Sequence, residues 1–238
     1  IPLRLVGSEM CIRDSENDEI ISLSSYLEKM PETQKDIYYI SAETRSQALA
    51  SPHLEGFKSK NIPILIMTDA IDQFWLPMIG SFKDKKFTSI TQGQINLDEL
   101  DEKNKDKKSV SKEQKEKQDK EFIDLIAQMK VVLGEQVKDI RLSSKLTDSP
   151  VCLVADDGDM DIAMEQLMAQ RDTNYKGAPR ILEINGDHSL IKNMKSLLSK
   201  KENNDLVSDA GTLLFEQARL LEGKMPVSYT HLTLPTIY

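Results

Sequence analysis

Short apolar runs alternate with amphipathic stretches along the first half of the chain. Three runs are rich in β-branched and aromatic residues and are typical of strands: DIYYIS (36–41), IPILIM (62–67) and KFTSIT (86–91). The stretches between them, 42–51 and 69–82, have room for crossover helices, and Asp69 is an expected N-cap. A short helix is also expected at 21–30. This pattern predicts an α/β unit, a small parallel sheet with helices on its faces.

The apolar spacing changes to that of a helix in the second half of the chain. One stripe consists of Phe122, Ile126, Met129 and Leu133, and Gly134 is placed to end that helix. Strands are then expected at 137–142, 150–155 and 180–185, and helices at 159–170, 188–200 and 206–223. We therefore predict a second unit, of α+β type.

A charged segment at 98–121 separates the two units. Lysines and acidic residues interleave there so densely that the segment cannot bury apolar surface. It can act as a flexible tether, or its second half can extend the next helix into solvent. We expect both, with disorder ending near Lys112. The predicted units are therefore 16–97 and 122–226.

The overall composition excludes several classes of protein. The net charge of −8 argues against a nucleic-acid surface, which needs clustered basic residues. Cys11 and Cys152 are too far apart for a disulfide framework, as is usual in a reducing cytosol. No apolar run approaches the ~20 residues that a membrane span needs. We expect a soluble, cytoplasmic protein with no nucleic-acid or membrane partner.

The two ends of the chain have a different character from the rest. Residues 1–15 (IPLRLVGSEMCIRDS) and 227–238 (VSYTHLTLPTIY) both look like translated adapter sequence. The first is not typical of a signal peptide, because Glu9 interrupts its apolar stretch. We expect both ends to lie outside the fold, as a non-native-looking leader and tail.

Three strings together resemble a known family. They are IYYISAETRSQALASPHLEGFKSKNIPILIMTDAIDQFW from Ile37, SSKLTDSPVCLVADDGDMDIAMEQLMAQRDT from Ser143, and RILEINGDHSLI from Arg180. In this order, over roughly 16–226, the chain resembles the C-terminal half of the ninety-kilodalton heat-shock chaperones, closest to the bacterial HtpG branch. The resemblance implies the end of the middle domain, followed by most of the C-terminal dimerisation domain, of a stress-response chaperone that binds non-native client proteins.

The resemblance also implies that the intact protein uses ATP and Mg. In the family the nucleotide pocket is in an N-terminal domain, and the arginine that reaches the γ-phosphate belongs to an upstream part of the middle domain. This chain has no glycine-rich phosphate loop. We expect no enzymatic activity and no cofactor for the chain itself.

Two groups of residues are candidates for client binding. The first is a stripe at i, i+4, i+7 and i+8 on one predicted helix, formed by Met160, Met164, Leu167 and Met168. Periodicity alone favours core packing for this stripe, whereas the family places client contacts on the corresponding helix. The second group is Phe74, Trp75 and Met78. The family places a client-contacting ring here, and either Phe74 or Trp75 can match it, while the other packs on the sheet.

The last predicted helix is the candidate for dimerisation. Its apolar face consists of Leu206, Ala210, Leu213, Leu214, Ala218 and Leu221. Family members pair two such helices per protomer into a four-helix bundle, and only the first is recognisable here. We therefore expect the homodimer to be weakened.

Other chemistries are less favoured by the residues. The Asp156–Asp161 run lacks the alternate spacing and later glutamate of a calcium loop, so we expect a helix start and no metal. Cys152 lies in an apolar run, where a thiol stays protonated, so a nucleophile assisted by His188 and Asp187 is not expected. Two alternatives remain: a small-molecule enzyme on the first unit, and a pure assembly module without client contact.

Overall fold

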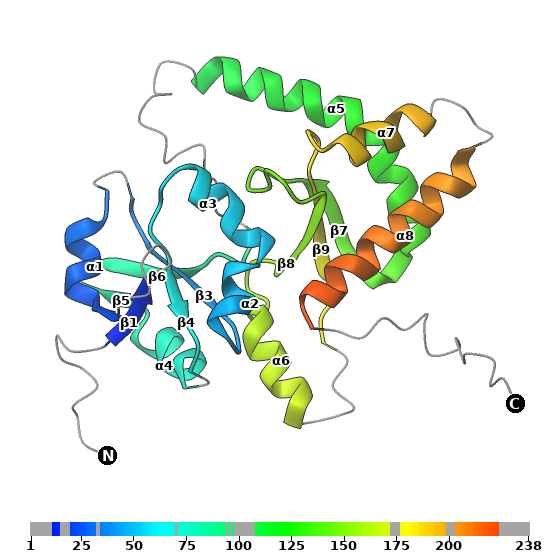
Figure 1. The fold of residues 1–238 in the computed structure, drawn as a ribbon. Coiled ribbons are helices and arrows are strands. Elements are labelled where there is room, and N and C mark those ends of the chain that lie inside the picture. Colours follow the sequence, from blue (N-terminus) through cyan, green and yellow to red (C-terminus); the bar gives the residue numbers. More distant parts are fainter. Residues whose placement is uncertain are drawn as a thin grey trace, which may run out of the picture.

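The chain folds into two modules that lie side by side (Figure 1). The computed structural model describes residues 11–14, 20–31, 34–69, 71–93, 95, 97, 108–171, 177–198 and 203–223. The first module, up to residue 97, surrounds a sheet with strand order β2-β1-β4-β3-β6-β5, and the second, from residue 108, surrounds a sheet with order β7-β9-β8. None of the helices in these ranges is both long and apolar enough to cross a bilayer.

Three parallel strands form the middle of the first sheet: β4 (Leu65–Met67), β3 (Ile37–Ser41) and β6 (Lys85–Ser89). Antiparallel strands extend both edges: β1 (Cys11–Asp14) and β2 (Ile20–Ser22) beside β4, and β5 (Ser81–Phe82) beside β6. Lys83 and Asp84, with φ of 46° and 64°, make the two-residue turn between β5 and β6. The predicted parallel sheet is present as these three central strands.

Strand β1 lies in the segment that the sequence pattern assigns to a leader. It pairs with both β2 and β4, with Arg13 opposite Ile66. A strand joins a sheet through backbone hydrogen bonds, and a four-residue strand leaves little periodicity to read in the sequence. The first sheet therefore includes residues that we expected to lie outside the fold.

Helices cover both faces of the first sheet. On the face of Tyr38 and Ile40 lie α2 (Arg45–Leu49), the 3₁₀ turn η2 (Pro52–Leu54) and α3 (Glu55–Ser59). On the face of Ile37 and Leu65 lie α1 (Leu23–Lys29) and α4 (Asp72–Ile79). Asp69 is not the N-cap of α4: its carboxylate accepts the Ile71 N–H at 3.3 Å in the preceding turn. Alternation along β3 thus divides the core into two layers.

The second module packs helices around a three-stranded sheet. Its central strand β9 (Arg180–Ile184) is parallel to β7 (Val137–Leu142) and antiparallel to β8 (Val151–Val154). The helices are α5 (Lys108–Leu133), α6 (Ile162–Arg171), α7 (Ser189–Leu198) and α8 (Asn204–Leu221), and the 3₁₀ turn η5 (Gly134–Gln136) follows α5. Helix α5 begins inside the charged segment, and its apolar end packs with α7 and α8 in the main core.

Polar contacts join the two modules. The backbone of Ala155 bonds to the first module twice, donating to the Thr91 carbonyl at 3.0 Å and accepting from the Gly93 N–H at 2.9 Å. Two buried or half-buried cations of the second module, Arg141 and Lys145, each donate to a backbone carbonyl of the 92–93 turn at 2.7 Å. These bonds fix the position of one sheet relative to the other.

Glu55 forms a further clamp between the modules. Its carboxylate accepts three successive backbone N–H groups, from Thr147, Asp148 and Ser149, at 2.8 to 3.1 Å, and also the Ser149 hydroxyl. Burial alone would raise the pKa of Glu55, but these hydrogen bonds outweigh burial and hold the pKa below its ordinary value. The clamp is therefore charged at neutral pH.

Candidate functional site

A cleft of about 560 Å³ lies between the two modules. The first module contributes α4 and the strands β3 and β6, and the second contributes the turn before α6 and the start of that helix. We call it the apolar cleft after four of its lining residues, Leu76, Phe87, Met160 and Met164. Polar lining groups include Tyr39, Ser89, Lys86, Asp159 and Asp161. The cleft thus combines apolar walls with a partly acidic rim.

The acidic turn before α6 places its methionines at the cleft. Asp161 accepts the Ala163 N–H at 2.9 Å, which caps the helix, and accepts the Thr91 hydroxyl at 2.8 Å from the other module. Lys138 bridges Asp156 at 2.7 Å and Asp159 at 3.0 Å. In the described part of the chain no cluster of three or more acidic, histidine or cysteine side chains is arranged to hold a metal ion.

The predicted methionine stripe is neither core nor fully solvated. Met160 is 40% exposed, whereas Met164, Leu167 and Met168 are half-buried. The buried face of α6 consists of Ile162, Ala163 and Glu165. Because Met160 and Met164 line the cleft, their flexible side chains are available to an apolar ligand there.

Helix α4 lines the cleft through Leu76, whereas the second predicted group on this helix, Phe74, Trp75 and Met78, is not among the lining residues. Ile71, Phe74 and Met78 form a stripe at three- and four-residue spacing, with Phe74 38% and Met78 85% exposed. Trp75 points differently: its Nε1 donates to Asp72 at 2.8 Å, and its ring packs edge-on against Phe87 at 5.8 Å. Phe74 is therefore the exposed ring of the pair, and Trp75 packs on the sheet.

The polar side of the cleft holds a protonated phenol. Burial, followed by the nearby charge of Asp161, raises the pKa of Tyr39, and a hydrogen bond with Ser89 opposes this only in part. Tyr39 is consequently neutral over the physiological range. It offers a hydrogen-bond donor without adding charge to a cleft that already carries Asp159 and Asp161.

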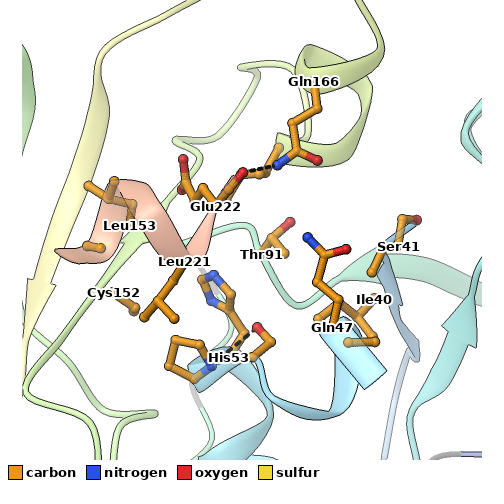
Figure 2. A pocket seen from close by; sticks show the side chains of 16 residues that line it. Ile40, Ser41, Gln47, His53, Thr91, Cys152, Leu153, Gln166, Leu221 and Glu222 are labelled. Atoms are coloured by element: carbon orange, nitrogen blue, oxygen red, sulfur yellow. Dashed lines mark hydrogen bonds between the residues drawn. The ribbon is translucent and has the colours of Figure 1, made fainter. Parts of the chain in front are cut away.

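A second, much smaller cavity of about 60 Å³ lies where α2, η2, β8, α6 and the end of α8 meet (Figure 2). It contains His53, Cys152 and Glu222. Burial, reinforced by Lys145, lowers the pKa of His53 to about 3, and burial raises the pKa of the Cys152 thiol. Because the His53 imidazole is neutral and the Cys152 thiol is protonated, the cavity offers no activated nucleophile. Its volume is also far below that of most ligand sites, which is roughly 300 Å³ or more.

The predicted dimerisation residues on α8 lie on two different faces. Leu214 and Ala218 are buried in the core of the second module, and Ala210 packs against it. Leu206, Leu213 and Leu221 are exposed, as is Leu220, which the sequence pattern did not single out. Leu206, Leu213 and Leu220 recur every seven residues and form a stripe that faces away from the core. Only the exposed leucines are free to meet a partner.

Comparison with known proteins places the chain in a family. The family model described as "Hsp90 protein" matches residues 11–231. The chain is 38% identical over 221 residues to the chaperone protein HtpG of Roseobacter denitrificans, covering 92% of this chain and 35% of that protein. It is 36% identical over 224 residues to the HtpG of Wolbachia pipientis wMel, covering 90% of this chain and 34% of that protein.

The class defined by these matches is that of the molecular chaperones. The chain belongs to the Hsp90 family and is of the bacterial HtpG type. It spans about a third of the length of the curated relatives that it matches. The match includes residues 11–15 and 227–231, which the sequence pattern assigns to a leader and a tail.

Proposed function

We propose that the apolar cleft binds exposed apolar segments of non-native client proteins. The observation that carries this proposal is that apolar side chains from both modules line one cleft, Leu76 and Phe87 from the first module and Met160 and Met164 from the second. Helix α4, which carries Leu76, also exposes Phe74 and Met78. A client segment seated in the cleft would remove Met160 and Met164 from water, and its continuation over α4 would cover Phe74 and Met78.

The expected affinity is modest. Burying one large apolar side chain contributes about 1.5–3 kcal/mol to the free energy of binding. A micromolar dissociation constant needs a net binding free energy of about 8 kcal/mol, which remains after the entropy lost on association has been subtracted. A few methionines and one phenylalanine therefore support weak, reversible binding. Their adaptable side chains suit clients of varied sequence.

We also propose that α8 contributes to a homodimer through the stripe of Leu206, Leu213 and Leu220. The support is the exposed heptad spacing on a helix whose opposite face is already packed. In the whole protein, ATP hydrolysis would drive changes in the cleft. A pure assembly role is the second candidate, and it would require that the cleft has no affinity for clients.

Suppression of aggregation tests the client-binding proposal. A heat-denatured test protein is followed by light scattering with the wild-type chain, with Met160→Ser/Met164→Ser, and with Phe74→Ser/Met78→Ser. Val131→Ser is the matched control, because Val131 is 80% exposed on α5 and does not line the cleft. We expect both double variants to lose suppression and the control to keep it. Equal suppression by all four proteins would contradict the proposal and favour assembly alone.

A further inference from the structure

A buried ion pair joins α6 to β9, and neither of its residues lines the cleft. Glu165 is in the first turn of the helix, Arg180 is the first residue of β9, and their side chains are 4% and 3% exposed. Two charges that leave water lose hydration, and their attraction seldom gives a net gain in stability over apolar side chains of similar size. Stability alone is therefore a weak explanation for this pair.

The guanidinium of Arg180 holds α6 at two points. One nitrogen, Nη2, pairs with the Glu165 carboxylate, and the other, Nη1, donates to the carbonyl of Met160 at 2.9 Å. Met160 directly precedes the capping residue of the helix and lines the cleft. The planar fork of an arginine can satisfy both acceptors with a fixed spacing, which a lysine cannot do.

Arg180 is carried by β9, a strand that is well fixed in the second module. Strand β9 is the central strand of its sheet, is buried along its whole length, and bonds to β7 and β8 on its two sides (Figure 1). Gly177, which precedes it at φ 67°, packs so closely on Glu165 that an added Cβ would collide with the Glu165 carboxylate. The carboxylate is thus confined between the guanidinium and the backbone.

We propose that Arg180 is a positioning residue for the apolar cleft: it fixes the start of α6 so that Met160 and Met164 face α4. The inference rests on the proposed client-binding role of the cleft. Arg180 itself does not line the cleft, so its effect is exerted through Glu165 and the Met160 carbonyl. Asp161, bonded to Thr91, and Gln166, bonded to the Glu222 carbonyl, also restrain α6, so the loss should be partial.

The test compares client affinity with the mobility of α6. Arg180→Lys is titrated against a permanently unfolded probe, reduced and carboxymethylated lactalbumin, and amide hydrogen exchange is measured over 160–168. We expect about a fivefold weaker affinity and faster exchange in α6, with exchange in β9 unchanged. Arg219→Lys is the matched control, because Arg219 pairs with Glu216 on α8 and is not among the residues that line the cleft. Its affinity should stay within about twofold of wild type.

A second variant separates positioning from stability. Glu165→Leu/Arg180→Met replaces the pair by apolar side chains and should recover the melting temperature of the wild type. It leaves the Met160 carbonyl without its donor, so client affinity should stay low. Wild-type affinity in this folded variant or in Arg180→Lys would overturn the proposal.

The same titration with Met160→Ser/Met164→Ser distinguishes the two proposals. If that variant binds like wild type, the client-binding role of the cleft is wrong. If it loses affinity while both Arg180 variants keep it, only the positioning role is wrong.

Discussion

Helices α6 and α8 are both amphipathic, but they are held in place by different kinds of contact. Helix α8 buries an apolar face that includes Val207, Leu214 and Phe215 in the core of the second module. Helix α6 buries only Ile162 and Ala163 as apolar residues, together with a charged Glu165. Its polar contacts include the Arg180 ion pair, the bond from Thr91 to Asp161 and the bond from Gln166 to the Glu222 carbonyl.

The two kinds of contact have different effects, one on the stability of the second module and the other on the orientation of α6. Apolar burial supplies most of the free energy of folding but does not depend on direction, whereas hydrogen bonds and ion pairs add little net stability and fix geometry. We infer that apolar burial of α8 stabilises the second module, while polar contacts set the orientation of α6 and the position of the second module relative to the first. Perturbing the two kinds of contact should therefore give different results.

The largest effect is expected from the buried face of α8. Leu214→Ala should lower the free energy of unfolding by about 2–5 kcal/mol, because it removes packed methyl groups and leaves a cavity. Leu213→Ala is the matched control at the preceding residue, which is exposed, and should change the free energy of unfolding by less than about 0.5 kcal/mol. Urea unfolding measures both. Similar losses in the two variants would contradict the burial of one face and the exposure of the other.

The next effect is expected at the Glu55 clamp. Glu55→Gln keeps the shape but loses the charge that accepts three backbone N–H groups, so the loss should be about 1–2 kcal/mol after allowance for solvent screening. The folded pKa lies below the ordinary value of 4.5. The stabilisation is therefore complete above pH 4.5 and is lost as the pH falls through the folded pKa.

The pH dependence gives this prediction a separate check. The difference in unfolding free energy between wild type and Glu55→Gln should be constant at neutral pH and should shrink below pH 4.5. A difference that grows on acidification would show that the clamp is not the carboxylate that the structure places at the junction.

A smaller effect is expected at Asp161. Asp161→Ala removes the cap on Ala163 and the bond to Thr91, which should lower stability by about 1 kcal/mol. Asp161→Asn keeps an effective cap and should lose less. Thermal unfolding, with hydrogen exchange in α6, measures both variants. Equal exchange rates in α6 for wild type and Asp161→Ala would show that the cap does not hold the helix start.

The smallest effect on stability is expected from the exposed stripe of α8. Leu213→Ser/Leu220→Ser should leave the unfolding free energy within about 0.5 kcal/mol of wild type. Self-association, measured by sedimentation over a range of concentrations, should weaken if this stripe is the homodimer surface. Unchanged sedimentation would remove that role from α8 and leave its exposed leucines without a partner.

Local periodicity predicts the elements well, because it reports which face each element buries. The central strands of both sheets, the start of α6 after its acidic turn and the long α8 all lie where the apolar spacing places them. Periodicity fails for β1, whose four residues are held by backbone pairing. It also does not separate the two faces of α8, since Leu213 and Leu214 are adjacent apolar residues, about 100° apart around the helix, of which the first is exposed and the second buried.

The contacts between distant segments could not be predicted from the sequence. Glu55 meets the backbone of 147–149 across the two modules, and Arg180 meets Glu165 within the second module. A charged residue inside an otherwise apolar strand pattern, such as Glu183 in RILEI, indicates a buried polar contact, because a buried charge needs a partner; Glu183 pairs with Arg141. The identity of that partner depends on the tertiary fold.

Methionine methyl NMR is the most direct test of client binding in the apolar cleft. The ε-methyl groups are labelled, and the unfolded probe is titrated into the chain. We predict that the signals of Met78, Met160 and Met164 shift together with one affinity, while those of the core residues Met129 and Met194 stay in place. Binding that leaves the Met160 and Met164 signals unchanged would contradict the assignment of client binding to the apolar cleft.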